Sequence, residues 1–156
     1  MTIVKAAIFL LAAASFGVTS TKPIAGESEQ AQFYNSPAAA AANLPFSQAV
    51  RVGDIWYLLG AIGVVPGKME LAPGGLEAEA KQTMENIGAI LRSNGLSFDD
   101  VFKCTVMIAD MAKWGAFNKL YVTYFKPDHL PKGKITDVST PAPLFVQSAI
   151  LVRRVS

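Results

Sequence analysis

The sequence is poor in the residue types that bind metals or form disulfides. Its 156 residues include one cysteine, Cys104, and one histidine, His129. A single cysteine cannot form an intramolecular disulfide, and Cys104 lies within an apolar stretch, where a small buried residue is favoured over a nucleophile. One histidine leaves too few ligands for a zinc site and no basis for a Ser-His-Asp triad. We therefore expect no metal centre.

The chain also lacks an excess of charge of either sign. Lysine and arginine total 14 and aspartate and glutamate total 12, which gives a net charge of +2. A nucleic-acid-binding surface needs a concentration of basic residues that this balance does not indicate, so we expect no nucleic-acid partner. The length is that of one compact domain.

No apolar run near the N-terminus is long enough for a typical membrane span of about 20 residues. The run from Ala6 to Phe16 follows Lys5 and precedes the small residues Val18-Thr19-Ser20. This is the pattern of a secretory signal peptide over 1–20. We predict cleavage after Ser20 and a periplasmic or secreted mature protein without membrane attachment, with an uncleaved anchor as the alternative.

The segment 21–43 is rich in small and polar residues and contains an alanine run after Pro37. We interpret it as a linker or loosely docked N-terminal arm, with a short helix as the alternative. The folded domain is then expected over 44–156.

A hairpin is predicted over Ser47–Leu59, because a Gly53-Asp54 turn separates two apolar runs. The following glycine- and proline-rich stretch, 60–75, is expected to be a loop with one short strand at 61–65. It does not have the glycine spacing or the Lys-Ser/Thr pair of phosphate-binding loops.

The next segments alternate between helical and extended periods. A helix is predicted over Leu76–Ser93, with acidic residues in its first turn and Gly95 beyond its end. Residues 101–109 alternate as a strand, with Phe102, Cys104, Val106 and Ile108 expected on its core face. A second helix, with an aromatic face, is expected between Asp110 and Pro127.

The last part of the chain is predicted as a loop over 126–134, a strand over 135–138 and a final strand over 145–152. This order favours an α+β fold, in which a sheet carries two helices on one face. The opposite face would be left open. We expect that face to meet a copy of itself.

Several motifs occur in the order in which they occur in one known family. The segment Leu44-Pro45-Phe46-Ser47-Gln48-Ala49-Val50 resembles the Gly-Pro-Tyr-Ser-Gln-Ala-Val opening of the reactive intermediate deaminase (RidA, or YjgF) family. Further matching residues lie in both predicted helices and in the strand between them: Gly75 to Ala78, Gln82, Asn86, Ile87, Asp100, Val101, Lys103, Thr105, Val106, Phe117, Asn118, Tyr121, Tyr124 and Phe125. The resemblance covers about 44–152.

This resemblance implies a chorismate-mutase-like protomer and a homotrimer with an inner barrel of sheets. It also implies ligand pockets between subunits. Active members of the family hydrolyse enamines and imines to 2-keto acids and ammonia without metal or cofactor. In them, an arginine in a Pro-x-Arg-Ser segment holds the substrate carboxylate, and a glutamate on the last strand helps to place the attacking water.

The chain departs from the family at these positions. The arginine segment reads Pro131-Lys132-Gly133-Lys134, so the place of the arginine falls to Lys132 or Gly133, and the glutamate is replaced by Gln147. Lysine can attract a carboxylate but lacks the planar fork of arginine, and glutamine cannot take a proton from water. The tyrosine of the opening motif is Phe46, and its glycine is Leu44.

The resemblance therefore gives two sets of candidate residues. The ligand-binding candidates are Phe46, Ser47, Asn118, Lys132 and Gly133, and the catalytic candidates are Lys132, Lys134 and Gln147. We expect a small ligand with a carboxylate in a pocket between subunits. The alternative is a trimer that binds a small molecule or acts as a chaperone without turnover.

Overall fold

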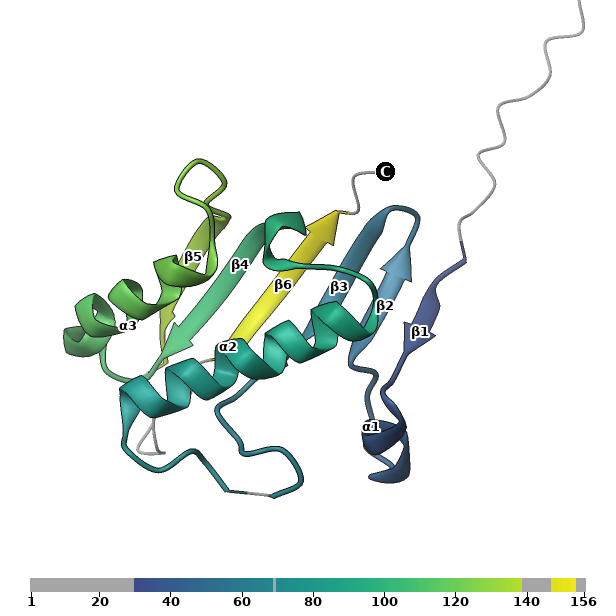
Figure 1. Cartoon of the computed structure of the whole chain (residues 1–156), viewed down its shortest axis with the longest axis horizontal. Coiled ribbons are helices and arrows are strands. Elements are labelled where there is room, and N and C mark those ends of the chain that lie inside the picture. The colour runs from purple at the N-terminus through teal and green to yellow at the C-terminus, as the bar shows by residue number, and fades with distance from the viewer. Residues whose placement is uncertain (1–29, 69, 139–146, 154–156) are drawn as a thin grey trace, which may run out of the picture.

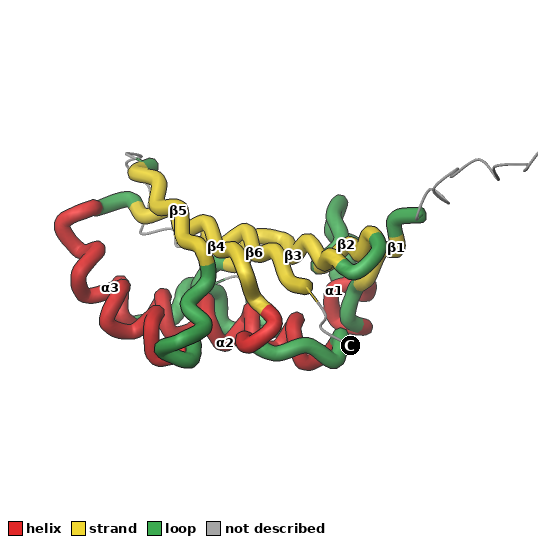
Figure 2. Tube along the Cα trace, turned by 90° about the horizontal axis from the view of Figure 1, so that it is seen from above, coloured by secondary structure: helices red, strands yellow, loops and turns green. Residues whose placement is uncertain are grey.

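The computed structural model describes residues 30–68, 70–138 and 147–153. They form a sheet that carries its helices on one face, as the two perpendicular views show (Figures 1 and 2). The strands are β1 (Gln32–Tyr34), β2 (Ala49–Val52), β3 (Ile55–Ala61), β4 (Val101–Ile108), β5 (Lys132–Asp137) and β6 (Gln147–Arg153). The α-helices are α1 (Pro37–Ala41), α2 (Leu76–Ser93) and α3 (Trp114–Tyr121).

The strand order is β1-β2-β3-β6-β4-β5. Neighbouring strands are antiparallel except β4 and β5, which are parallel. A parallel pair needs a crossover connection, and the segment that contains α3 supplies it. The C-terminal strand β6 lies between β3 and β4 and pairs with both.

The core lies between the sheet and α2. The predicted apolar face of this helix is buried, with Ala80, Met84, Ile87 and Leu91 at most 1% exposed. The predicted bounds Leu76–Ser93 are confirmed. Gly95 ends the helix with a φ of 69°. Leu96 N–H donates to the Leu91 carbonyl at 2.9 Å, which is the characteristic bond of a Schellman motif.

Strand β4 is confirmed, but the prediction that Phe102 lies on its core face is wrong. Phe102 is 43% exposed and Val101 is 4% exposed. The reason is an irregularity in the pairing with β6, in which Val101 pairs with Val152 and Lys103 with Leu151. The surplus residue between them shifts the alternation by one position. From Cys104 onward the predicted alternation holds, and Cys104, Val106 and Ile108 are buried.

The second helical region differs in detail from the single helix that was predicted. It begins as a 3₁₀ turn over Met111–Lys113, continues as α3, and ends as a second 3₁₀ turn over Val122–Tyr124. Asp110 caps the start as expected, because its Oδ1 accepts from Ala112 N–H at 3.0 Å. The 3₁₀ geometry tightens the ends of a short helix, where backbone groups lack intrahelical partners.

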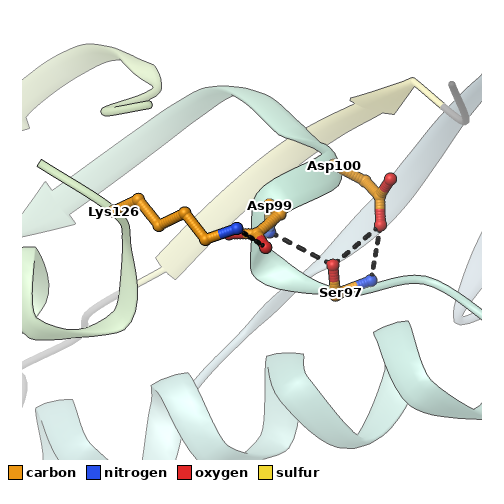
Figure 3. Close-up of polar contacts among 4 residues, drawn as sticks. All are labelled: Ser97, Asp99, Asp100 and Lys126. Carbon is orange, nitrogen blue, oxygen red and sulfur yellow. Dashed lines mark hydrogen bonds and ion pairs between the residues drawn. The ribbon is translucent and has the colours of Figure 1, made fainter. Parts of the chain in front are cut away.

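A capped turn leads into β4 (Figure 3). Ser97 Oγ accepts from Asp99 N–H at 3.2 Å, and Asp100 Oδ2 accepts from Ser97 N–H at 2.8 Å. Lys126 Nζ then reaches Asp99 Oδ2 at 2.5 Å, which ties the segment after α3 to the start of β4. Because this ion pair is exposed, we expect it to contribute little to the stability of the protein. Its role is to hold the segment after α3 beside the turn before β4.

Part of the expected N-terminal arm belongs to the fold. Residues 32–34 form β1, which pairs with β2, so the sheet begins ahead of the predicted domain start at Leu44. The alanine run forms α1, whose N-cap is Ser36. The expected hairpin is confirmed as β2 and β3. The predicted signal peptide lies outside the described residues.

Two extended segments differ from prediction. The strand expected at 135–138 starts earlier, so Lys132 to Lys134 lie on β5 and not in a loop. An edge strand needs only backbone pairing on one side, and β5 therefore shows little of the apolar pattern by which a strand is recognised. Beyond Ala61 the expected short strand is reduced to an isolated bridge between Val64 and Leu71.

The loop after β3 is fastened to α2 by a side-chain amide. Asn86 Nδ2 donates to the Ile62 carbonyl at 3.0 Å and to the Val64 carbonyl at 2.9 Å. Gln82 Nε2 in turn donates to Asn86 Oδ1 at 3.0 Å. These bonds give a structural role to the glutamine and the asparagine that match the family pattern.

The sheet face opposite the helices is called the open face here. On β2 and β3 it carries apolar side chains, among them Val52 and Tyr57, which are 37% and 48% exposed. On β4 and β5 it carries Lys103, Lys132 and Lys134. Among the residues that the structure describes, no helix is long and apolar enough to cross a membrane.

Candidate functional site

The first group of predicted site residues lies in the loop before β2. Phe46 is 46% exposed and Ser47 is partly buried. The loop is held by Gln48, whose Oε1 accepts from Ser36 N–H at 2.8 Å and whose N–H donates to Asn35 Oδ1 at 2.8 Å. The carbonyl of Gln48 also accepts from Leu59 N–H at 2.9 Å. Phe46 and Ser47 therefore directly precede a residue, Gln48, that three hydrogen bonds hold in place.

The second group lies on the edge strand β5. Lys132 is paired with Lys103, Gly133 with Cys104 and Lys134 with Thr105. All three residues of this group are exposed. A Cβ added at Gly133 would have no heavy atom within 4 Å. The structure therefore has room for a side chain at one of the two positions where the family has its arginine.

These two groups do not meet within one protomer. Strands β3, β6 and β4 lie between β2 and β5, which corresponds to a separation of about 19 Å at the usual strand spacing. The directions of the strands add to this separation. Strand β2 is antiparallel to β3, whereas β4 and β5 are parallel to β3, so the start of β2 and the start of β5 lie at opposite ends of the sheet. Ser47 and Lys132 are consequently at diagonally opposite corners of the sheet.

Gln147 and Asn118 occupy two further places. Gln147 begins β6 and its backbone pairs with Met107 near the end of β4. This is the end of the sheet at which Ser47 lies, since the neighbouring Ser148 pairs with Ala61. Asn118 lies on α3, in the helical layer, and is partly buried. A site that contains all the candidates therefore needs residues from more than one copy of the chain.

A groove of about 540 Å³ lies between α2 and α3. Its lining includes Glu77, Gly115 and Lys119 and none of the predicted site residues. Within 30–68, 70–138 and 147–153, no group of three or more histidine, cysteine, aspartate or glutamate side chains could hold a metal ion.

Sequence reasoning missed the environment of one carboxyl group. Glu79, in α2, was interpreted as an acidic residue at a helix start, yet it is 7% exposed. Its Oε2 has no hydrogen-bond partner among the described residues. Burial raises the pKa of this carboxyl, and the nearby charge of Lys113 partly opposes the shift. The spacing from Leu76 was a usable signal, because residues three apart share a helix face.

We expect Glu79→Gln to stabilise the protein more at pH 8 than at pH 4. A raised pKa means that the folded chain holds the proton more tightly, so the contribution of Glu79 to stability is complete at low pH and is lost as the pH rises through the folded-state pKa. Glutamine has nearly the same shape and does not ionise. Urea unfolding of both proteins at the two pH values measures the difference.

The control for this substitution is Glu77→Gln in the same helical turn. Glu77 is exposed, so its replacement removes a carboxyl group from the same turn without relieving burial, and it should not reproduce the gain at pH 8. A gain from Glu79→Gln that is the same at pH 4 and pH 8 would contradict the effect of burial.

The family model described as endoribonuclease L-PSP matches residues 33–155. A mouse 2-iminobutanoate/2-iminopropanoate deaminase is 46% identical over 82 residues, which are 53% of this chain and 61% of the mouse protein. The chain thus covers less than two thirds of that relative. A goat protein of the same name is 38% identical over 117 residues, 67% of this chain and 85% of the goat protein.

The structure is also similar to the crystal structure of RidA from an Antarctic Psychrobacter. The TM-score is 0.69 and the sequence identity 31%, and the match covers 79% of this chain and 99% of the other. The α+β fold predicted from the sequence is confirmed by this match. The predicted family is confirmed as well.

Proposed function

Because this chain belongs to the endoribonuclease L-PSP (RidA/YjgF) family, we propose that it is an imine- or enamine-hydrolysing deaminase whose pocket lies between the subunits of a homotrimer. The observation that carries the proposal is the similarity to deaminases, over 85% of the goat protein. The proposed ligand is a small carboxylate. In the reaction, water adds to the C=N carbon of a 2-imino acid and the nitrogen takes up protons. The C–N bond then breaks, which releases ammonia and gives a 2-keto acid.

The separation of the candidate residues supports assembly. One protomer carries Ser47 and Lys132 at opposite corners of its sheet, so a neighbouring copy must supply one of the two to a shared pocket. The open face gives a second reason. It exposes Val52 and Tyr57, and burial of apolar area against another copy would be favourable.

The groups present on β5 and β6 fit a slow version of this reaction. Lys132 and Lys134 provide positive charge for a carboxylate but no bidentate fork, so they attract the substrate more than they orient it. Gln147 can hold a water molecule by hydrogen bonds, but its amide cannot serve as the base that takes its proton. Turnover then depends on positioning and on proton transfer to solvent.

A second candidate function is binding without turnover. It is favoured by the substitutions themselves, since glycine or lysine stands at the position of the arginine and Gln147 at that of the glutamate. Each change removes a group that acts on the substrate while the fold is retained.

Expression of residues 21–156 tests the proposal. We expect the purified protein to sediment as a trimer at micromolar concentration and to speed the hydrolysis of 2-iminopropanoate, which an amino-acid oxidase generates in the assay. The measurement is the rate of loss of the imine to a trapping agent, compared with a protein-free control. A trimer without acceleration would favour the binding protein, and a monodisperse monomer would exclude the intersubunit pocket.

We also propose export of the mature chain, on the basis of the sequence pattern of 1–20. When the full-length chain is expressed, the protein recovered from the periplasm or the medium should have the mass of residues 21–156. A recovered protein with the mass of the chain from Met1 would contradict cleavage.

A further inference from the structure

Three lysines stand together on the open face at the β4–β5 edge. Lys103 and Lys132 are direct partners across the parallel pair, and Lys134 follows on the same side of β5 as the partner of Thr105. These positions alternate with Cys104 and Val106, which are buried under the helices. By this alternation the three lysines lie on the side of the sheet opposite the described helices, which Figure 2 shows together on the other side. They are called the lysine cluster below.

No member of the lysine cluster forms an ion pair with another described residue. The ion pairs of the described part of the chain join Lys81 to Glu85, Lys113 to Asp110 and Lys126 to Asp99. None of them includes a lysine of the cluster. The one acidic residue of β4 and β5 is Asp137, which alternates onto the other side of β5. Like charges directly opposite each other across a strand pair are destabilising. The cluster is thus a local cost in the isolated protomer.

The spacing of these residues indicates what could offset that cost. Adjacent strands are about 4.8 Å apart and alternate residues on one strand about 6.6 Å apart. Flexible lysine side chains on such a frame can converge on one small ligand. They act as point charges without a planar fork, so they select a ligand by its total charge more than by the shape of one carboxylate.

We propose that Lys103, Lys132 and Lys134 form a binding site for a small anion that carries two or more negative charges. If the proposed function holds, on which this assignment of a substrate class rests, the preferred substrate is the imine of a dicarboxylic 2-keto acid and not of a monocarboxylic one. One carboxylate of such a substrate is next to the C=N group that reacts. The other carboxylate binds those lysines of the cluster that the first does not contact. This gives Lys103 a role in specificity.

Isothermal titration calorimetry of residues 21–156 at low salt tests the proposal with stable keto acids as probes. We expect 2-oxoglutarate to bind about tenfold more tightly than 2-oxobutanoate, which corresponds to about 1.4 kcal/mol. This is the scale of one additional charge interaction at a few ångströms in a well-hydrated site. Inorganic phosphate should displace 2-oxoglutarate, whereas acetate at equal ionic strength should not.

Two variants locate the effect. Lys103→Gln should reduce the preference for 2-oxoglutarate to about threefold or less, whereas Lys119→Gln on α3 removes the same charge elsewhere and should preserve it. Without ligand, Lys103→Gln should melt at the temperature of the parent protein or above it, since it relieves a like-charge pair. A lower melting temperature, or a preference unchanged in Lys103→Gln, would overturn the proposal.

Binding and turnover separate this inference from the proposed function. Hydrolysis of 2-iminopropanoate with equal affinity for both keto acids would refute the lysine site and leave the deaminase. Preferential binding of 2-oxoglutarate without hydrolysis of any imine would keep the site and refute the deaminase. Binding of a single-stranded RNA oligonucleotide, with no heat from 2-oxoglutarate, would also overturn the small-anion site.

Discussion

Gly63→Ala should lower the free energy of unfolding by about 3 kcal/mol, at the upper end for a substitution that adds one methyl group to a packed site. The added Cβ would lie 2.5 Å from the carbonyl oxygen of Glu79 and 2.7 Å from its Cα. Both are backbone atoms of α2, which cannot rotate away as a side chain could. Relief of the clash would have to move α2 and the loop after β3 apart.

Thermal and urea unfolding measure this loss, which should appear as a fall in melting temperature of roughly 10 °C. Gly115→Ala is the matched control. Gly115 lies in α3, and a Cβ there meets no heavy atom within 4 Å. Alanine should therefore stabilise that helix by about 0.5–1 kcal/mol. An unchanged stability in Gly63→Ala would show that the loop after β3 and α2 are farther apart than described.

Gly133→Arg combined with Gln147→Glu should raise kcat/KM for 2-iminopropanoate by about 10- to 100-fold. A bidentate arginine–carboxylate contact is a charged hydrogen bond of about 1.5–3 kcal/mol, and a carboxylate at position 147 supplies the missing base. The arginine can be added because the space around Gly133 is open. Steady-state kinetics on the single and double variants apportion the gain.

Lys132→Arg tests the other position at which the arginine of the family could fall, since it places a guanidinium one residue away, on the open face. It keeps the positive charge of Lys132 and should raise kcat/KM less than Gly133→Arg does. A gain from Lys132→Arg and none from Gly133→Arg would assign the arginine position to residue 132. No gain in any of the variants, with the oligomer intact, would favour binding without turnover.

The parts of the fold that the sequence predicted well are those with a strong local pattern. Helix α2 has a regular apolar face and a glycine that ends it, so its bounds were predictable. The hairpin was predictable because Gly53 marks its turn and has a φ of 58°. The core part of β4 was predictable from alternation. Each of these signals lies within a few neighbouring residues.

The features that were missed depend on distant partners. The side of Phe102 is set by the pairing with β6, some fifty residues later in the chain, and no local pattern contains that information. Strand β1 is defined by its pairing with β2, and the start of β5 by its pairing with β4. The burial of Glu79 likewise depends on which segments cover α2. The candidate site residues came from family resemblance, and their distribution over the sheet required the topology.

The central place of β6 has a consequence for how the protein is made. Strand β6 follows β3 and β4 in the chain and pairs with both, so within the described sheet these two strands are joined only after residues 147–153 have been made. Contacts of such long sequence separation form slowly, since a long segment must be closed first. A nascent chain in which β6 has not yet been made therefore cannot complete this sheet, and we expect the sheet to close only late in synthesis.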